Sequence, residues 1–226
     1  MKLRAVVGFA LYVVLSFGIL FIAAGTLAWP MAWVYAVLSL VMILASRLLV
    51  WRKWPDALRE RGQFTEAEGI QPWDRLLSFI VGLLGPTTVG IVAGLDHRFS
   101  WSPKVPDSAV AAATLLVAVG FGLGTWAMVA NRYFSAVARI QSDRGQSVVR
   151  GGPYRFVRHP AYAGALLSGL ATPVMLSALW AWIPALGMII AVVIRTRLED
   201  RMLLEGLEGY ADYAESAPFR LIPGIW

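Results

Sequence analysis

The chain consists mainly of apolar stretches that are long enough to cross a lipid bilayer, and this restricts it to very few folds. A membrane-spanning helix needs roughly 20 consecutive apolar residues. The backbone groups of such a segment must be hydrogen-bonded internally, which favours helices. Hydrophobic residues make up 58% of the chain and charged residues 15%, so we predict an all-α integral membrane protein. The apolar stretches lie at 5–29, 31–51, 76–95, 109–130 and 162–194.

The last of these stretches is too long for a single membrane helix. At about 1.5 Å per residue it would extend for about 50 Å, whereas the hydrocarbon core is about 30 Å thick. Pro173 and Pro184 can interrupt a helix, and residues 177–180 between them can form a turn. We therefore predict a hairpin of two short helices and about six membrane segments in all. The first stretch is included because it is too long for the apolar part of a signal peptide.

Lysine and arginine residues gather in alternate loops. The positive-inside rule places such loops in the cytoplasm, which predicts that both termini and the long loop at 131–161 are cytoplasmic. The formal charge of +6 does not indicate nucleic-acid binding, because the arginines are divided among short loops. The basic residues of the predicted cytoplasmic side include Lys2, Arg4, Arg52, Lys53, Arg59, Arg61, Arg132, Arg139, Arg144, Arg150, Arg155, Arg158, Arg195, Arg197, Arg201 and Arg220, against Arg98 and Lys104 on the other side.

The second half of the chain carries most of the polar detail. The loop at 131–161 is too long and too rich in glycine for a plain connector, and loops of this length are often binding elements. After residue 194 the chain becomes charged, which predicts that the last membrane helix continues into the cytosol and that a short helix follows at 209–216. We therefore divide the chain into scaffold helices at 1–130 and a functional region at 131–226. Within the scaffold, Gly120, Gly122 and Gly124 predict close packing against a neighbouring helix.

Several kinds of chemistry are excluded by the residues that the chain lacks. It has no cysteine, which rules out disulfides, thiol nucleophiles and thiolate metal sites. Its two histidines, His97 and His159, are predicted on opposite sides of the membrane, so we expect no metal site. The sequence also shows no Walker-type phosphate loop and no Ser-His-acid set.

Residues 151–164 place glycines, prolines, tyrosines and three arginine or histidine side chains at the start of an apolar stretch. Ionisable groups at that depth are costly unless they bind something, so this segment is a candidate site. His159 suits a proton carrier or a ligand contact, or else it is a polar residue at the membrane surface. Pro160 suits the first turn of a helix, whose free N–H groups can receive an anionic group.

Arg195 and Glu199 are four residues apart and therefore share one face of a helix. They can form an ordinary surface ion pair, worth about 0.3–0.5 kcal/mol. Alternatively, Glu199 holds a cationic ligand group while Arg195 faces an acidic one. Their place, where a membrane helix meets water, favours the functional interpretation. Tyr210, Tyr213 and Trp226 are better explained by packing or by an interfacial aromatic belt.

Taken together, these residues resemble the isoprenylcysteine carboxyl methyltransferase family of integral-membrane methyltransferases. The order and spacing of the motifs agree from about residue 131 to the end of the chain, and phospholipid and thiol methyltransferases share much of the set. The matching residues are Gly152, Pro153, Tyr154, Arg158, His159, Pro160, Ala161, Tyr162, Gly164, Arg195, Glu199, Asp200, Leu203, Tyr210, Tyr213, Ile222 and Pro223.

The resemblance implies an enzyme that uses S-adenosyl-L-methionine, bound between the long loop and the two motifs. It also implies a bacterial cytoplasmic membrane, with the active site facing the cytoplasm, and membrane lipids as surroundings. Arg195 takes the position that contacts the acceptor, plausibly its carboxylate, and Arg195 and His159 are the implied catalytic residues. The implied cofactor-binding residues are Gln141, Gln146, Ser147, Val148, Val149, Tyr154, His159, Pro160, Ala161, Tyr162 and Glu199.

The sequence departs from the family pattern in two places. Gln146 stands where several relatives have histidine, and Asp200 replaces the second acid of a Glu-Glu pair. Both changes leave the implied cofactor in place, and neither identifies the acceptor. The leading interpretation is methyl transfer to a lipophilic small molecule or lipidated substrate, with an isoprenylcysteine-like carboxylate favoured. The alternatives are a phospholipid amine or thiol methyltransferase and a non-enzymatic membrane scaffold or transporter.

Overall fold

The structure is a computed structural model, and it describes residues 17–57 and 69–226. In these ranges the chain is helical without any strand, which confirms the predicted all-α class. The α-helices are α2 (Pro30–Lys53), α4 (Pro72–Phe79), α5 (Gly85–Phe99), α6 (Asp107–Ala130), α7 (Pro160–Met175), α8 (Trp182–Gly206) and α9 (Tyr210–Ser216). A π-helical turn η1 (Ile80–Leu84) joins α4 to α5, and three 3₁₀ turns are η2 (Ser142–Arg144), η3 (Gly152–Arg155) and η4 (Leu179–Ala181).

Four helices of the described ranges are long and apolar enough to cross a membrane: Pro30–Lys53, Pro72–Phe99, Asp107–Ala130 and Leu179–Gly206. They contain the predicted segments at 31–51, 76–95 and 109–130 and the second half of the predicted hairpin. Of the first predicted segment, 5–29, residues 5–16 lie outside the described residues and residues 17–24 are helical, while α7 has only 16 residues. The count of six segments and the side of the membrane on which each loop lies stay predictions.

The predicted hairpin is present, although its helices are not bounded by the two prolines. Pro173 lies inside the last turn of α7, and Pro184 lies in the first turn of α8. A proline in the first turn of a helix removes no intrahelical hydrogen bond. The chain reverses at residues 176–178, where Ser177 has a φ of 52°. The second helix is not short, because the membrane segment and the charged segment after residue 194 form one helix of 25 residues.

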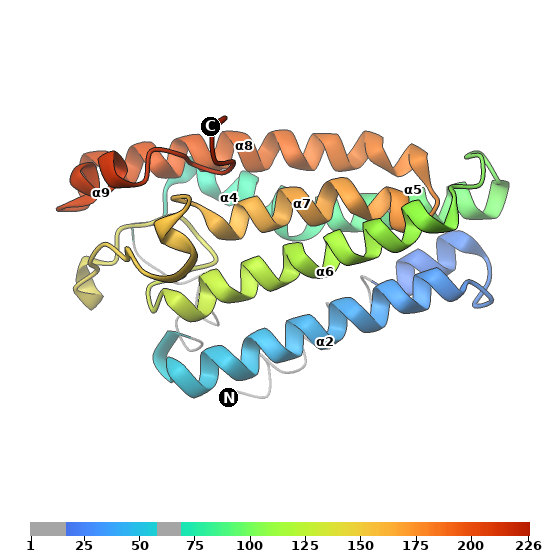
Figure 1. Cartoon of the computed structure of the whole chain (residues 1–226), viewed down its shortest axis with the longest axis horizontal. Helices are drawn as coiled ribbons and strands as arrows, with labels where there is room; N and C mark the ends of the chain where they lie inside the picture. Colours follow the sequence, from blue (N-terminus) through green and yellow to red (C-terminus); the bar gives the residue numbers. More distant parts are fainter. Residues whose placement is uncertain (1–16, 58–68) are drawn as a thin grey trace.

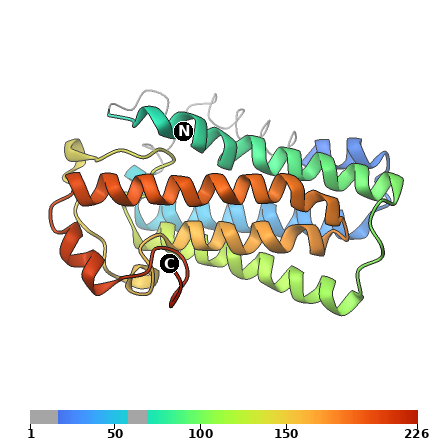
Figure 2. The ribbon, with the colours of Figure 1, turned by 90° about the horizontal axis from the view of Figure 1, so that it is seen from above.

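The helices lie side by side, and the long connections gather at one end of the bundle. Figures 1 and 2 show the loop after α6, the helix α9, the C-terminal tail and the end of α2 at that same end. These are the segments that the arginine pattern predicts on one side of the membrane. At the opposite end, the buried carboxylate of Asp96 accepts hydrogen bonds from the Ser102 hydroxyl (2.6 Å) and the Trp180 N–H (3.1 Å). His97 lies at that opposite end, whereas His159 directly precedes α7.

The backbones of helices α6 and α7 lie close together at two glycines. A Cβ atom on Gly120 would lie 2.6 Å from the carbonyl oxygen of Gly164, and a Cβ atom on Gly164 would overlap the Gly120 carbonyl. The predicted close packing is therefore confirmed for Gly120. Gly122 differs, since a Cβ atom there would meet nothing within 4 Å. The contact fixes the first half of α7 against α6, next to the end of the bundle where the loops gather.

We expect Gly120→Val to lower the thermal unfolding temperature of the detergent-solubilised protein, because the new side chain collides with backbone atoms that cannot move aside. Overpacking of this kind typically costs about 1–3 kcal/mol. The matched control is Gly122→Val, which makes the same change in the same helix but in open space. Circular dichroism at increasing temperature measures both. Equal unfolding temperatures for the two variants would show that the α6–α7 contact is looser than described.

Candidate functional site

A pocket opens at the loop end of the bundle, between α6, the following loop and helices α7, α8 and α9. Its cavity volume is about 100 Å³, and about 830 Å³ of empty space lies within its walls when the open mouth is counted. The structure brings every candidate site residue of the sequence to this pocket. Its lining includes Gln141, Gln146, Ser147, Val148, Val149, Tyr154, His159, Pro160, Ala161, Tyr162, Arg195 and Glu199.

The first turn of α7 forms one wall of the pocket. The backbone of His159 is not helical (φ −125°, ψ 64°), and Pro160 opens the helix that follows it, as the sequence predicted. Because the first N–H groups of a helix lack intrahelical acceptors, those of Ala161 and Tyr162 are available at the pocket. The His159 ring is buried and its Nε2 atom lies 3.3 Å from Asp200 Oδ1. The ring also stacks on that of Tyr162, with 5.8 Å between the ring centroids.

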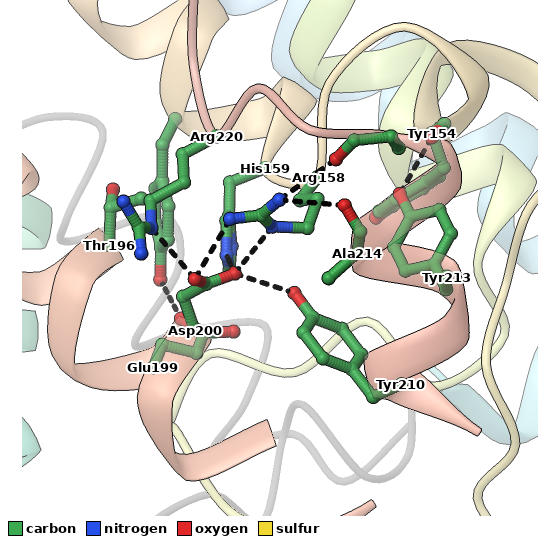
Figure 3. A network of polar contacts seen from close by, with 12 residues as sticks. Tyr154, Arg158, His159, Thr196, Glu199, Asp200, Tyr210, Tyr213, Ala214 and Arg220 are labelled. Carbon is green, nitrogen blue, oxygen red and sulfur yellow. Dashed lines mark hydrogen bonds and ion pairs between the residues drawn. The ribbon is translucent and has the colours of Figure 1, made fainter. Parts of the chain in front are cut away.

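Asp200 is completely buried and holds several cationic and polar side chains together (Figure 3). Its carboxylate accepts hydrogen bonds from Arg158 Nε (2.7 Å), Arg220 Nε (2.7 Å) and the Tyr210 hydroxyl (2.9 Å). Burial, together with the neighbouring carboxylate, raises the pKa of Tyr210 and keeps its hydroxyl a donor. Asp200 therefore has its hydrogen-bonding capacity occupied by the protein, and its role is to hold the wall of the pocket.

The C-terminal tail is tied into the same cluster through its backbone. The N–H groups of Arg158 and His159 donate to the carbonyls of Phe219 and Arg220, both at 2.9 Å. Arg158 Nη1 also donates to the carbonyls of Ala217 (2.8 Å) and Pro218 (3.0 Å). The segment after α9 thus supports the residues that lead into α7.

Glu199 is the carboxylate that faces the pocket. Its Oε2 atom accepts a hydrogen bond from the Tyr162 hydroxyl at 2.6 Å. Tyr154 is buried nearby, and its hydroxyl accepts a hydrogen bond from the Asn131 side chain at 3.2 Å. Burial raises the pKa of Tyr154, so this phenol stays protonated. A carboxylate among tyrosines suits a ligand that carries a positive charge.

Arg195 does not form the ion pair with Glu199 that was one of the two interpretations of the sequence. Its guanidinium instead forms a two-pronged ion pair with Asp74 of α4, at 2.6 Å from Nε to Oδ1 and 3.1 Å from Nη2 to Oδ2. Nη2 also donates to the carbonyl of Ala136 at 2.9 Å. Asp74 is completely buried, and sequence reasoning missed it. An acidic residue just after Pro72 resembles an ordinary helix start, so no local signal distinguishes it.

The two glutamines predicted at the site shape the loop that covers the pocket. Gln141 is buried, with its Nε2 donating to the Tyr133 carbonyl (2.6 Å) and its Oε1 accepting from Arg144 (2.5 Å). Gln146 Oε1 accepts from the Gln141 N–H at 2.6 Å. The side chain of Gln141 is therefore occupied inside the loop. The pocket also includes residues that the sequence did not single out as site residues, among them Asn131, Tyr133, Phe134, Ser135, Val137, Met202, Tyr210 and Tyr213.

Residues 108–208 match the sequence model of the phospholipid methyltransferase family. The match covers slightly less than half of the chain. The family comprises integral-membrane methyltransferases and includes the isoprenylcysteine carboxyl methyltransferases. No curated protein matches the chain. The phospholipid methyltransferase segment runs from α6 to the end of α8 and contains every candidate site residue, whereas Asp74, Tyr210 and Arg220 lie outside it.

Proposed function

We propose that the protein transfers a methyl group from S-adenosylmethionine to a lipophilic acceptor at the membrane surface. The observation that supports this most strongly is the convergence of the candidate residues on one pocket within the phospholipid methyltransferase segment. The pocket lies where apolar helices meet the polar loops. A water-soluble cofactor can therefore reach it from the loop side, while an amphiphilic acceptor arrives laterally between helices.

The residues of the pocket fit the cofactor. Glu199 and the aromatic rings of Tyr154 and Tyr162 would hold its cationic part, because carboxylates and ring faces both attract cations. The free N–H groups at the start of α7 would receive its carboxylate. The apolar side chains of Val148 and Val149 would contact its flat base. When bound, S-adenosylmethionine supplies an activated methyl group.

The protein's own contribution to such a reaction is orientation and the exclusion of water. Methyl transfer is an in-line displacement, and its rate depends strongly on how well the two reactants are aligned. The ring of His159 is held by Asp200 and by stacking on Tyr162, so it can contact the reactants from a fixed position. A carboxylate acceptor needs no base because it is already ionised. An amine or thiol acceptor must lose a proton, and His159 is the residue that would accept it under this proposal.

The acceptor that the family resemblance favours is the carboxylate of an isoprenylcysteine-like molecule, with Arg195 as its contact. A lipid amine is the second candidate, and one observation favours it. The charge of Arg195 is already balanced by Asp74, and Glu199 adds a negative charge on the same helix face. A group that carries no negative charge meets less repulsion there.

We expect the wild-type protein, purified in detergent, to bind S-adenosylmethionine in the micromolar range, as measured by isothermal titration calorimetry. His159→Ala should weaken binding about tenfold, because the ring forms part of the pocket wall. His97→Ala is the matched control: this exposed histidine stacks on Trp29 at the other end of the bundle, so binding should change less than twofold. A folded wild type without binding would refute the methyltransferase proposal and favour a scaffold or transporter.

A further inference from the structure

Asp74 lies behind the pocket and is the only described carboxylate that forms an ion pair with Arg195. The pair is bidentate: Nε and Nη2 of the guanidinium each point at one carboxylate oxygen. Nη2 is engaged a second time by the Ala136 carbonyl. Among the described residues, Nη1 has no hydrogen-bond partner, and Arg195 lines the pocket. One edge of the guanidinium is thus fixed by the protein, and Nη1 remains for a ligand.

Asp74 also fixes the part of the loop that covers Arg195. The N–H of Ala138 donates to Asp74 Oδ2 at 2.7 Å, and the Ala138 carbonyl accepts from the Gln71 N–H at 3.1 Å. The start of α4 therefore holds Ala138 from both sides. Its neighbours Ser135 and Val137 line the pocket. A single buried carboxylate consequently positions both the arginine and the adjoining wall.

The three charged groups around Arg195 have a net negative charge. Arg195 contributes one positive charge, while Asp74 and Glu199 contribute two negative ones. Tyr162 contacts both Arg195 and Glu199: the Arg195 guanidinium carbon lies 5.4 Å from the centroid of its ring, and its hydroxyl donates to Glu199 at 2.6 Å. Because the Asp74 carboxylate lies within hydrogen-bonding distance of the guanidinium, its negative charge offsets much of the attraction of Arg195 for a further anion. Arg195 therefore offers one N–H donor without a net positive charge.

We propose that Asp74 is a positioning residue that sets the charge preference of the acceptor site through Arg195. With Asp74 in place, the attraction of Arg195 for an anionic acceptor is reduced, and groups without negative charge compete better. This inference rests on the proposed function, since it concerns the acceptor of the same reaction. It assigns a role in the site to a helix outside the phospholipid methyltransferase segment.

The test uses two probes with the same farnesyl chain, S-farnesyl-3-mercaptopropionate and S-farnesylcysteamine, which end in a carboxylate and an amine. Binding of each to the full-length protein is measured by calorimetry, with and without S-adenosylhomocysteine. Asp74→Asn should raise the ratio of carboxylate to amine affinity at least tenfold, because Arg195 loses its counter-charge but keeps a partner of the same shape. Asp74→Glu should keep the ratio within threefold of the wild type.

The double variant Asp74→Asn with Arg195→Gln isolates the proposed route. In the Arg195→Gln background, Asp74→Asn should shift the ratio by a clearly smaller factor than in the wild-type background, because the guanidinium through which Asp74 acts is absent. Arg195→Gln alone should shift the ratio at least tenfold toward the amine. This variant tests the contribution of Arg195 even if Asp74→Asn does not fold. Equal losses for both probes, or the same shift in both backgrounds, would overturn the proposal. If the probes bind but the cofactor does not, the proposed methyl transfer is refuted. The ratio of carboxylate to amine affinity can still be measured in that case, so the role of Asp74 is still tested.

Discussion

Glu199→Ala should weaken the binding of S-adenosylmethionine about 100-fold, the largest loss expected from any single change in the pocket. Hydrogen bonds to a charged group contribute about 1.5–3 kcal/mol each, and Glu199 is the acidic side chain that lines the pocket. Its one described partner is the Tyr162 hydroxyl, so the carboxylate keeps capacity for a cationic ligand. Isothermal titration calorimetry on the detergent-purified variant measures the change.

The control for this prediction is Glu208→Ala, which removes an exposed carboxylate that does not line the pocket. Its affinity should stay within twofold of the wild type. Glu199→Gln separates charge from shape: it should lose most of the affinity that alanine loses, because the amide keeps the size but not the charge. If Glu199→Ala bound the cofactor like the wild type, the cationic part of the ligand would have to be held elsewhere.

Asp200→Ala should cause the largest loss of stability. The carboxylate is completely buried among Arg158, Arg220, His159 and the Tyr210 hydroxyl. Removing one partner of a buried charge cluster costs about 3–5 kcal/mol, because the remaining charges stay buried without compensation. We expect a clear drop in unfolding temperature and faster proteolysis of the segment after α8. Thermal unfolding and limited trypsin digestion measure the two effects.

Asp212→Ala provides the comparison for this variant. Asp212 is an exposed residue in the first turn of α9, where an acidic side chain contributes about 0.3–1 kcal/mol. It should therefore lower the unfolding temperature only slightly. Similar unfolding temperatures for Asp200→Ala and Asp212→Ala would mean that the cluster around Asp200 is not what holds the tail.

The membrane helices and the hairpin could be predicted from the sequence because each depends on a local property. Apolar length predicted α2, α5, α6 and the membrane part of α8, and the excess length of the last apolar stretch predicted the turn. The boundaries were less predictable. Pro173 lies within α7, two residues before the helix ends at Met175, and no sequence signal marks that boundary. The first predicted segment and the number of membrane crossings remain predictions.

The pocket residues could be proposed only as a group, through a family resemblance, and their individual tasks could not. Glu199 and Asp200 are neighbours in the sequence, but successive side chains of a helix point in directions about 100° apart. One therefore faces the pocket and the other the tail. The partner of Arg195 is 121 positions away, in α4. Such a pairing depends on how the helices pack, which no local pattern encodes.

The ion pair between α4 and α8 has a practical consequence for anyone who exchanges parts between relatives. A chimera that replaces only residues 108–208 would bring in a new arginine-bearing helix but keep the old Asp74 and the old tail. Two buried charge pairs would then cross the junctions between parents. A difference between the parents at Asp74 or at Arg220 would leave an unpaired charge at the corresponding junction. Successful exchange therefore requires α4, the phospholipid methyltransferase segment and the tail to be moved as one unit.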